Sequence, residues 1–181
     1  MSRLTIPARD DVPADSRPIL DAVQSQLGVV PNMFRLIASS PAVLNGYTAN
    51  NAALAKALDV KTRERIALAV AQVNGCDYCL SAHSYLGMNM AKISAEEIAL
   101  NRMGRSSDPK ADAAVRFATN VVRDRGRVAD ADIEAVRKAG FSDGQIVEII
   151  AVAAENVFTN LLNVVAGTDI DFPVVQAAEA A

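Results

Sequence analysis

Apolar residues recur at intervals of three and four along most of the chain, which is the spacing of one face of an α-helix. Between positions 13 and 27, for example, Ile19, Leu20, Val23 and Leu27 fall at helical spacing. No convincing apolar–polar alternation is followed by a turn and a second such run, the pattern that predicts paired β-strands. The pattern therefore predicts an all-α fold.

Capping residues mark where the predicted helices begin and end. The pair Ser40-Pro41 is a strong start signal, Ser142 forms a capping-box pattern with Gln145, and Asn74-Gly75 is a natural stop. The predicted helices cover 13–27, a short segment from 31, 41–58, 59–74, 76–88, a segment capped by residue 94, 109–126, 130–139 and 143–166.

Two of the predicted helices have similar apolar compositions, and we predict that they form the centre of a helical bundle. The segments 59–74 and 142–156 are both capped and rich in Ile, Val and Ala, and Asp59 or Thr62 caps the first. The apolar face of the first consists of Ile66, Ala69, Val70 and Val73. Without a low-complexity linker, we predict one domain over 1–181, with a tail at 168–181 that packs on a neighbour or stays loose.

Composition narrows the kind of core and the kind of partner. Hydrophobic residues make up 51% of the 181 positions, aromatic residues only 4%, and there is no Trp, so aliphatic side chains and Met must build the core. The net charge of −3 and a pI near 5.2 argue against general affinity for nucleic acid or an anionic membrane.

No segment reaches the roughly 20 apolar residues that a transmembrane helix needs. The longest candidate, 146–165, is interrupted by two glutamates and three asparagines. The N-terminus lacks the apolar core of a signal peptide. We therefore expect a cytoplasmic protein, in which two close cysteines are more often catalytic, redox-active or metal-binding than a structural staple.

Cys76 and Cys79, the only cysteines, lie three positions apart, and the only histidine, His83, follows four positions later. On a helix these positions share one face, so the three side chains project into one small volume. A helix N-terminus beside Cys76 and a base beside Cys79 both favour the reactive thiolate. One thiolate can attack a peroxide or a disulfide, and the other can resolve the product.

Glu64 is the candidate fourth member of the site, one predicted helix before the cysteines. The break at Asn74-Gly75 lets the two helices fold against each other, which brings this carboxylate toward His83. A carboxylate beside an imidazole fixes its tautomer and can pass protons. Flanking arginines make Glu64 unremarkable by sequence alone.

The spacing of Glu64, Cys76, Cys79 and His83 resembles the core motif of the alkylhydroperoxidase D (AhpD)-like proteins, within the carboxymuconolactone decarboxylase superfamily. The resemblance covers roughly 42–125. The Pro-Asn-Met-Phe segment before it and the capped helix near the C-terminus look like the longer, peroxidase-related branch of that family.

The resemblance implies an AhpD-like helical bundle that assembles as a homotrimer or a multiple of it. It also implies thiol-dependent reduction of organic hydroperoxides, with Cys79 peroxidatic, Cys76 resolving, and Glu64 and His83 relaying protons. An external dithiol of lipoyl or thioredoxin type would restore the thiols, and no bound cofactor is required. Tyr78 stands where the best-known peroxidase of the family has a second histidine, and a phenol with pKa about 10 is a poor base at neutral pH.

Other interpretations of the motif stay open at this point. The two cysteines, His83 and Glu64 could ligate zinc, or the cysteines could be inert buried residues. A carboxymuconolactone decarboxylase-like lyase and a non-catalytic redox-sensing module are alternative functions. Haem attachment is excluded, because Leu80 rather than histidine follows Cys79.

A polar stripe interrupts the last long helix. Asn156, Asn160 and Asn163 predict either buried hydrogen bonds, beside the site or at a subunit interface, or a solvated face. Glu155 beside them could pair with an arginine, which the sequence does not identify.

Aromatic and methionine residues outside the motif also admit two interpretations. Phe34, Tyr47 and Phe158 either line an apolar substrate pocket or, as helical spacing favours, pack in the core. Met88 and Met90 are expected in the core or at an interface.

Overall fold

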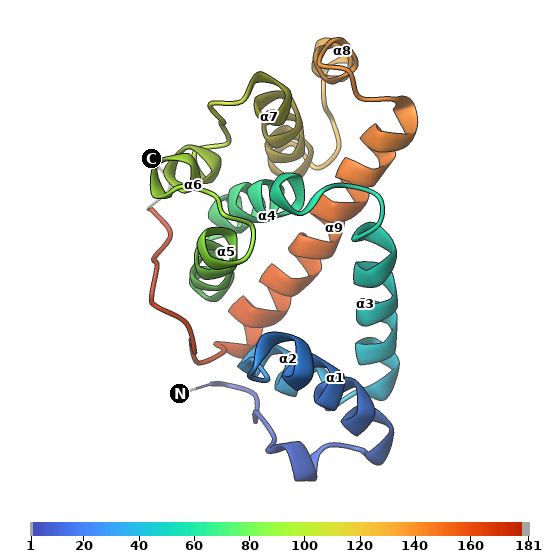
Figure 1. Ribbon diagram of the computed structural model, residues 1–181, viewed down its shortest axis with the longest axis vertical. Coiled ribbons are helices and arrows are strands. Elements are labelled where there is room, and N and C mark those ends of the chain that lie inside the picture. Colours follow the sequence, from blue (N-terminus) through green and yellow to red (C-terminus); the bar gives the residue numbers. More distant parts are fainter. Residues whose placement is uncertain (1, 179–181) are drawn as a thin grey trace.

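The computed structural model describes residues 2–178, and every regular element in that range is a helix (Figure 1). The four predicted caps Ser40, Asp59, Ser94 and Ser142, and also Asp108, accept a hydrogen bond from a backbone N–H in the first turn of their helix. The 3₁₀ helices are η1 (Arg9–Asp11) and η2 (Ala14–Ser16). The α-helices are α1 (Arg17–Leu27), α2 (Asn32–Ile37), α3 (Pro41–Leu54), α4 (Val60–Val73), α5 (Asp77–Asn89), α6 (Ala95–Arg102), α7 (Pro109–Arg123), α8 (Asp130–Lys138) and α9 (Asp143–Ala166).

Helix α4 lies at the centre of the molecule, packed against α5, α6, α7 and α9 (Figure 1). Every residue from Ile66 to Ala71 is buried, so all sides of this stretch are covered, and its small alanines let the neighbouring helices approach closely. The sequence predicted a single apolar face that included Val73. That part of the prediction is wrong, because Val73 is the last residue of α4 and is exposed there.

Helix α9 crosses the molecule diagonally, from α8 to the end formed by α1 and α2 (Figure 1). It begins in the capping box of Ser142 and Gln145, ends at Ala166 with Gly167 as its C-cap, and packs against α4 as the two-helix centre predicts. By length and composition it could cross a membrane, with a mean hydropathy of 1.6, but 44% of that stretch is buried inside this chain. Its buried face is thus part of the core.

Three helices are shorter than predicted. α1 begins at Arg17 rather than at 13, since Ala14–Ser16 form the 3₁₀ helix η2. α3 ends at Leu54 rather than near 58, because the chain then continues in turns, with Ala57 N donating to Leu54 O at 3.1 Å, until the α4 cap. α7 ends at Arg123 rather than near Gly126, since Arg125 and Gly126 both have positive φ and cannot continue a right-handed helix.

The tail after α9 packs along α5 of its own chain. Val175 N donates to Ser81 Oγ at 2.9 Å, and Ala177 N donates to Asp77 Oδ1 at 2.8 Å. The described part of the tail therefore packs on its own chain and is not loose. Positions 179–181, which the tail prediction included, lie outside the described residues.

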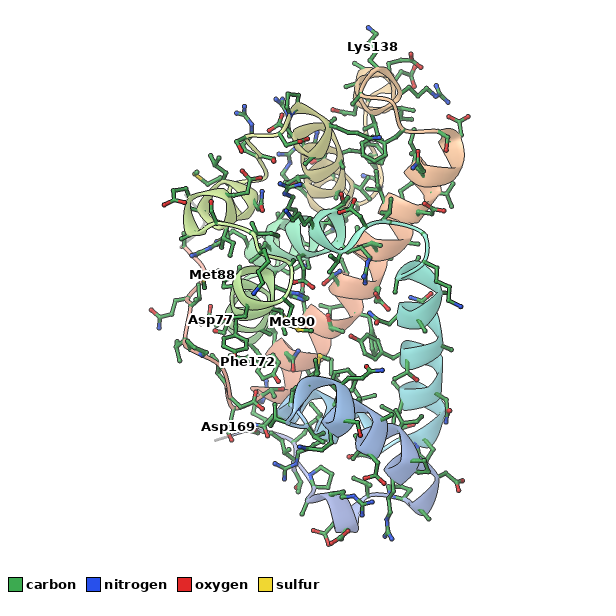
Figure 2. All side chains as sticks on the ribbon, in the orientation of Figure 1. Asp77, Met88, Met90, Lys138, Asp169 and Phe172 are labelled. Carbon is green, nitrogen blue, oxygen red and sulfur yellow. A yellow bond between two sulfur atoms is a disulfide. The ribbon has the colours of Figure 1, made fainter. Side chains whose placement is uncertain are left out.

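The methionines near the end of α5 are not core residues. Met88 and Met90, which are labelled in Figure 2, have exposed fractions of 43% and 57%. The prediction of core packing is wrong for both, since they lie at the C-terminal end of α5, where the chain turns toward α6.

Candidate active site

The two cysteines lie at the start of α5. Gly75 adopts a left-handed conformation, φ 64°, which turns the chain out of α4. Cys76 is the N-cap of α5, one position before the first turn, and its sulfur accepts a hydrogen bond from Cys79 N at 3.2 Å. Cys76 and Cys79 are joined as a disulfide, and both are buried.

Helix α9 supplies a donor to one of the two sulfurs. The side-chain amide nitrogen of Asn163 lies 3.4 Å from Cys79 Sγ. An N–H donor in this position stabilises negative charge on the sulfur once the disulfide is opened. Asn156 and Asn160 are buried as well, and Asn160 Oδ1 accepts a hydrogen bond from Asn74 at 2.8 Å. The asparagine stripe is therefore buried beside the site and is not a solvated face.

The structure brings His83 of α5 and Glu64 of α4 together. His83 Nδ1 lies 2.9 Å from Glu64 Oε2, and both side chains are largely buried. Burial by itself lowers the pKa of His83, but the charge and hydrogen bond of Glu64, with a contribution from Glu155, outweigh it, so the pKa of His83 is raised. The pair can hold a proton at the imidazole and release it toward a neighbouring group.

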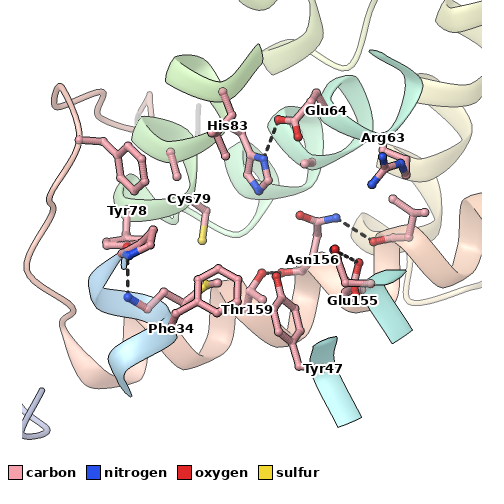
Figure 3. A pocket seen from close by; sticks show the side chains of 18 of the residues that line it. Phe34, Tyr47, Arg63, Glu64, Tyr78, Cys79, His83, Glu155, Asn156 and Thr159 are labelled. Atoms are coloured by element: carbon pink, nitrogen blue, oxygen red, sulfur yellow. Dashed lines mark hydrogen bonds and ion pairs between the residues drawn. The ribbon is translucent and has the colours of Figure 1, made fainter. Parts of the chain in front are cut away.

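A cavity of ≈ 120 Å³ opens beside Cys79 (Figure 3). Cys79, His83 and Glu64 all line it, whereas Cys76 does not and lines a second hollow with Asn163. The apolar lining comes from Leu27, Pro31, Met33, Phe34, Ala67, Ala82, Leu86, Val152 and Phe172. The remaining polar lining comes from Tyr47, Asn51, Arg63, Tyr78, Glu155, Asn156 and Thr159. An organic molecule in this cavity therefore meets one sulfur of the pair and the His–Glu pair at once.

The aromatic prediction holds in part. Phe34 and Tyr47 line the cavity and pack edge to face, with ring centroids 5.8 Å apart. Phe158 packs beside Tyr47 but does not line the cavity and is 39% exposed. Its side of α9 faces outward, which the spacing along the sequence does not reveal.

Two charged residues of the cavity were not predicted as site residues. Arg63 comes from α4 and Glu155 from α9 (Figure 3). Within residues 2–178 the Glu155 carboxylate forms no ion pair with an arginine. It accepts hydrogen bonds from the side chains of Asn50 at 3.1 Å and Asn51 at 3.4 Å, and burial raises its pKa. The only sequence signal for Arg63 was its position beside Glu64.

Tyr78 lines the same cavity, but its hydroxyl bonds to α2 rather than to the His83–Glu64 pair. Its hydroxyl accepts a hydrogen bond from Met33 N at 3.1 Å, and its ring packs edge to face on Phe172 of the tail. Burial raises the pKa of the phenol. Tyr78 thus ties α2 and the tail to α5 and does not replace the missing histidine as a base.

The described residues contain no group of three or more His, Cys, Asp or Glu side chains placed to hold a metal ion. The four ligands of the zinc interpretation therefore do not form such a group in the disulfide-bonded site.

Fold and site together define a class of protein: an all-helical protein with a Cys-x-x-Cys disulfide on a helix that packs against a glutamate-bearing helix. The sequence profile of the Carboxymuconolactone decarboxylase family matches residues 41–124. A solved structure of an alkylhydroperoxidase AhpD core, an uncharacterized peroxidase-related protein from Ralstonia eutropha JMP134, is 30% identical with a TM-score of 0.83. The match covers 94% of this chain and 92% of that one. The chain therefore belongs to the carboxymuconolactone decarboxylase superfamily, among its AhpD-like members.

Three further proteins are similar to this chain. A peroxidase-related protein from Silicibacter sp. TM1040 is 25% identical with a TM-score of 0.81, over 93% of this chain and 91% of that one. The debrominase Bmp8 shares the fold at 18% identity, TM-score 0.79, over 94% of both chains. An uncharacterized Haemophilus influenzae protein is 52% identical over 46 residues, 24% of this chain and 41% of that protein. This match spans less than half of that relative.

Proposed function

We propose that the protein is a thiol-dependent peroxidase that reduces organic hydroperoxides through Cys79 and Cys76. The observation that carries the proposal is that Cys79 and the His83–Glu64 pair line one cavity large enough for a small organic molecule. Cys76 forms the disulfide with Cys79 but does not line this cavity. The two peroxidase-related structural relatives favour the same class of reaction. Because a debrominase has the same fold, the fold alone does not determine which reaction is catalysed.

The chemistry begins with the reduced pair. The Cys79 thiolate attacks the outer oxygen of the hydroperoxide, so an S–O bond forms and the O–O bond breaks. The alkoxide that leaves takes a proton from the His83 imidazolium and departs as an alcohol. Asn163 stabilises the thiolate before the attack, and Glu64 stabilises the imidazolium.

Cys76 completes the cycle. Its thiol condenses with the Cys79 sulfenic acid, so the disulfide forms and one water is released. An external dithiol, of lipoyl or thioredoxin type, then exchanges with the disulfide, becomes a disulfide itself and returns two thiols to the protein. In sum, one hydroperoxide and one dithiol give one alcohol, one water and one disulfide.

Substitution of each cysteine tests the proposal. We expect Cys79→Ser to lower hydroperoxide turnover with dihydrolipoamide or thioredoxin by about 10³-fold or more. Cys76→Ser should stop after one equivalent and leave a sulfenic acid on Cys79, detectable by trapping with a sulfenic-acid reagent and mass spectrometry. Full turnover by Cys79→Ser would refute the assignment. Reaction of the wild type with a single equivalent, and no turnover with any dithiol, would favour a redox-sensing module.

We also propose that the protein acts in the cytoplasm, where dithiol reductants are available, and that copies associate as a homotrimer or a multiple of it. The support for association is an apolar face on the outer side of α9. Its large exposed residues are Val147, Ile150, Phe158, Leu161, Val164 and Val165. Several are separated by three, four or seven positions, the spacing with which one helix packs along another, so a second copy of this chain fits this face.

A further inference from the structure

Arg63 brings a cation with free donors into the cavity beside Cys79. Its Nε donates to the Leu58 carbonyl at 3.2 Å, and this bond holds the guanidinium group against the turn that precedes α4. Within residues 2–178 its two terminal nitrogens, Nη1 and Nη2, make no hydrogen bond or ion pair with the protein. Figure 3 shows the group at one end of the cavity, with no partner drawn to it.

The other charged groups at this end already have partners. Glu64 is held by His83, and Glu155 accepts hydrogen bonds from Asn50 and Asn51. The Glu64–His83 pair is neutral overall when the imidazole is protonated. Burial raises the pKa of Glu155, although the charge of Arg63 acts to lower it. Within residues 2–178 no carboxylate lies within ion-pair distance of Nη1 or Nη2, so an anion that enters the cavity meets Arg63 as a cation with free donors.

The rest of the cavity favours a small apolar body. Met33, Phe34 and Leu86 belong to its apolar lining. Its volume of ≈ 120 Å³ is of the order of a cavity that accommodates benzene, about 150 Å³. A ligand that fills it thus has a compact hydrocarbon part.

We propose that Arg63 selects compact organic hydroperoxides that carry a carboxylate. The carboxylate binds the free Nη groups in a two-pronged contact, the hydrocarbon part lies against the apolar lining, and the hydroperoxide group lies at Cys79. This inference rests on the peroxidase function proposed above and adds the class of substrate. Arg63 acts as a specificity-determining residue, and the bond-making steps stay those of Cys79 and Cys76.

Matched substrates test the selection. tert-Butyl hydroperoxide is neutral, while 3-hydroperoxy-3-methylbutanoate and its one-methylene-longer homologue, 4-hydroperoxy-4-methylpentanoate, carry the same reacting group with a carboxylate. We expect the wild type to show a kcat/KM about tenfold or more higher for at least one acid than for the neutral compound. In Arg63→Gln this ratio should fall to near one, and Arg63→Lys should keep part of it. Equal kcat/KM values for all three substrates in the wild type would overturn the inference.

Lys61→Gln is the matched control. It removes one positive charge from the same end of α4, but Lys61 is exposed and does not line the cavity. The acid-to-neutral ratio should stay at the wild-type value in this variant. A fall equal to that of Arg63→Gln would assign the preference to long-range charge and overturn the role of Arg63.

Binding without reaction separates this inference from the peroxidase proposal. 3-Hydroxy-3-methylbutanoate, 4-hydroxy-4-methylpentanoate and tert-butanol are the corresponding alcohols and contain no peroxide. NMR titration of the oxidised protein should show tighter binding of at least one hydroxy acid than of tert-butanol, lost in Arg63→Gln. If this binding is found and no hydroperoxide is turned over, the peroxidase proposal fails and the anion site stands. If hydroperoxides are turned over and neither hydroxy acid binds more tightly than tert-butanol, the anion site fails alone.

Discussion

The His83–Glu64 pair couples the protonation of the site to the stability of the fold. Because Glu64 raises the pKa of His83 in the folded chain, the folded state binds the imidazole proton more tightly than the unfolded state does. The resulting stabilisation is fully present below the unfolded pKa of about 6.5 and is lost as the pH rises through the higher folded pKa. Glu64 thus stabilises the fold most under mildly acidic conditions.

Glu64→Gln tests this coupling in the oxidised protein, in which the cysteines do not titrate. We expect the free energy of unfolding, measured with urea, to fall by about 1–3 kcal/mol at pH 6 and by clearly less at pH 9. Glu134→Gln serves as the control, since Glu134 is half exposed and pairs with Arg137 on the surface. An equal loss at both pH values in Glu64→Gln would contradict the coupling.

Asn163 shows how a residue far away in the sequence enters the site. Its amide reaches Cys79 across 84 positions because α9 packs on α5. Asn163→Leu should leave the site residues in place but remove the donor. We expect the thiolate fraction of Cys79 at pH 7, measured by the rate of alkylation of the reduced protein in a Cys76→Ser background, to fall by about threefold or more. An unchanged rate would show that the donor does not act on the thiolate.

At the scale of the element, the turn between α4 and α5 decides where the disulfide lies. Gly75 has φ 64°, and a Cβ placed on it would meet no atom within 4 Å. The left-handed backbone conformation, rather than a steric clash with a neighbour, is therefore the reason that glycine is favoured here. The cap of α5 is the Cys76 sulfur itself. The geometry of the reactive pair is therefore built into the start of the helix.

Gly75→Ala should lower the free energy of unfolding by about 1–2 kcal/mol, because a Cβ is unfavourable in the left-handed region. Gly46→Ala is the matched control within α3, where the added Cβ also meets no atom within 4 Å and the backbone is helical. That change should stabilise the chain by about 0.5–1 kcal/mol. Urea unfolding measures both, and effects of the same sign would contradict the argument.

At the scale of the whole molecule, the outer face of α9 predicts assembly. Leu161 is 58% exposed on this face, whereas Val174, 66% exposed, lies on the tail. We expect the wild type to be oligomeric by light scattering coupled to size exclusion, and Leu161→Asp to dissociate it at micromolar concentration. Val174→Asp should leave the assembly intact. A monomeric wild type would refute association through this face.

Local signals in the sequence determined the elements and the reactive group. Caps such as Ser142 and breaks such as Gly75 act within a few residues, because they satisfy backbone groups at helix ends. The spacing of Cys76, Cys79 and His83 is also local, since one helix fixes it. The all-α class and the closeness of the two cysteines could therefore be read directly.

Packing decided what the sequence left open. Whether the asparagine stripe is buried, whether Phe158 faces the cavity and where Val73 points depend on which side of each helix its neighbours cover. The same packing turned Tyr78 toward Met33 and brought Arg63 to the cavity. The sequence by itself thus determined the helices and the thiol pair, while only the tertiary structure decided what surrounds that pair, because those contacts join residues far apart in the chain.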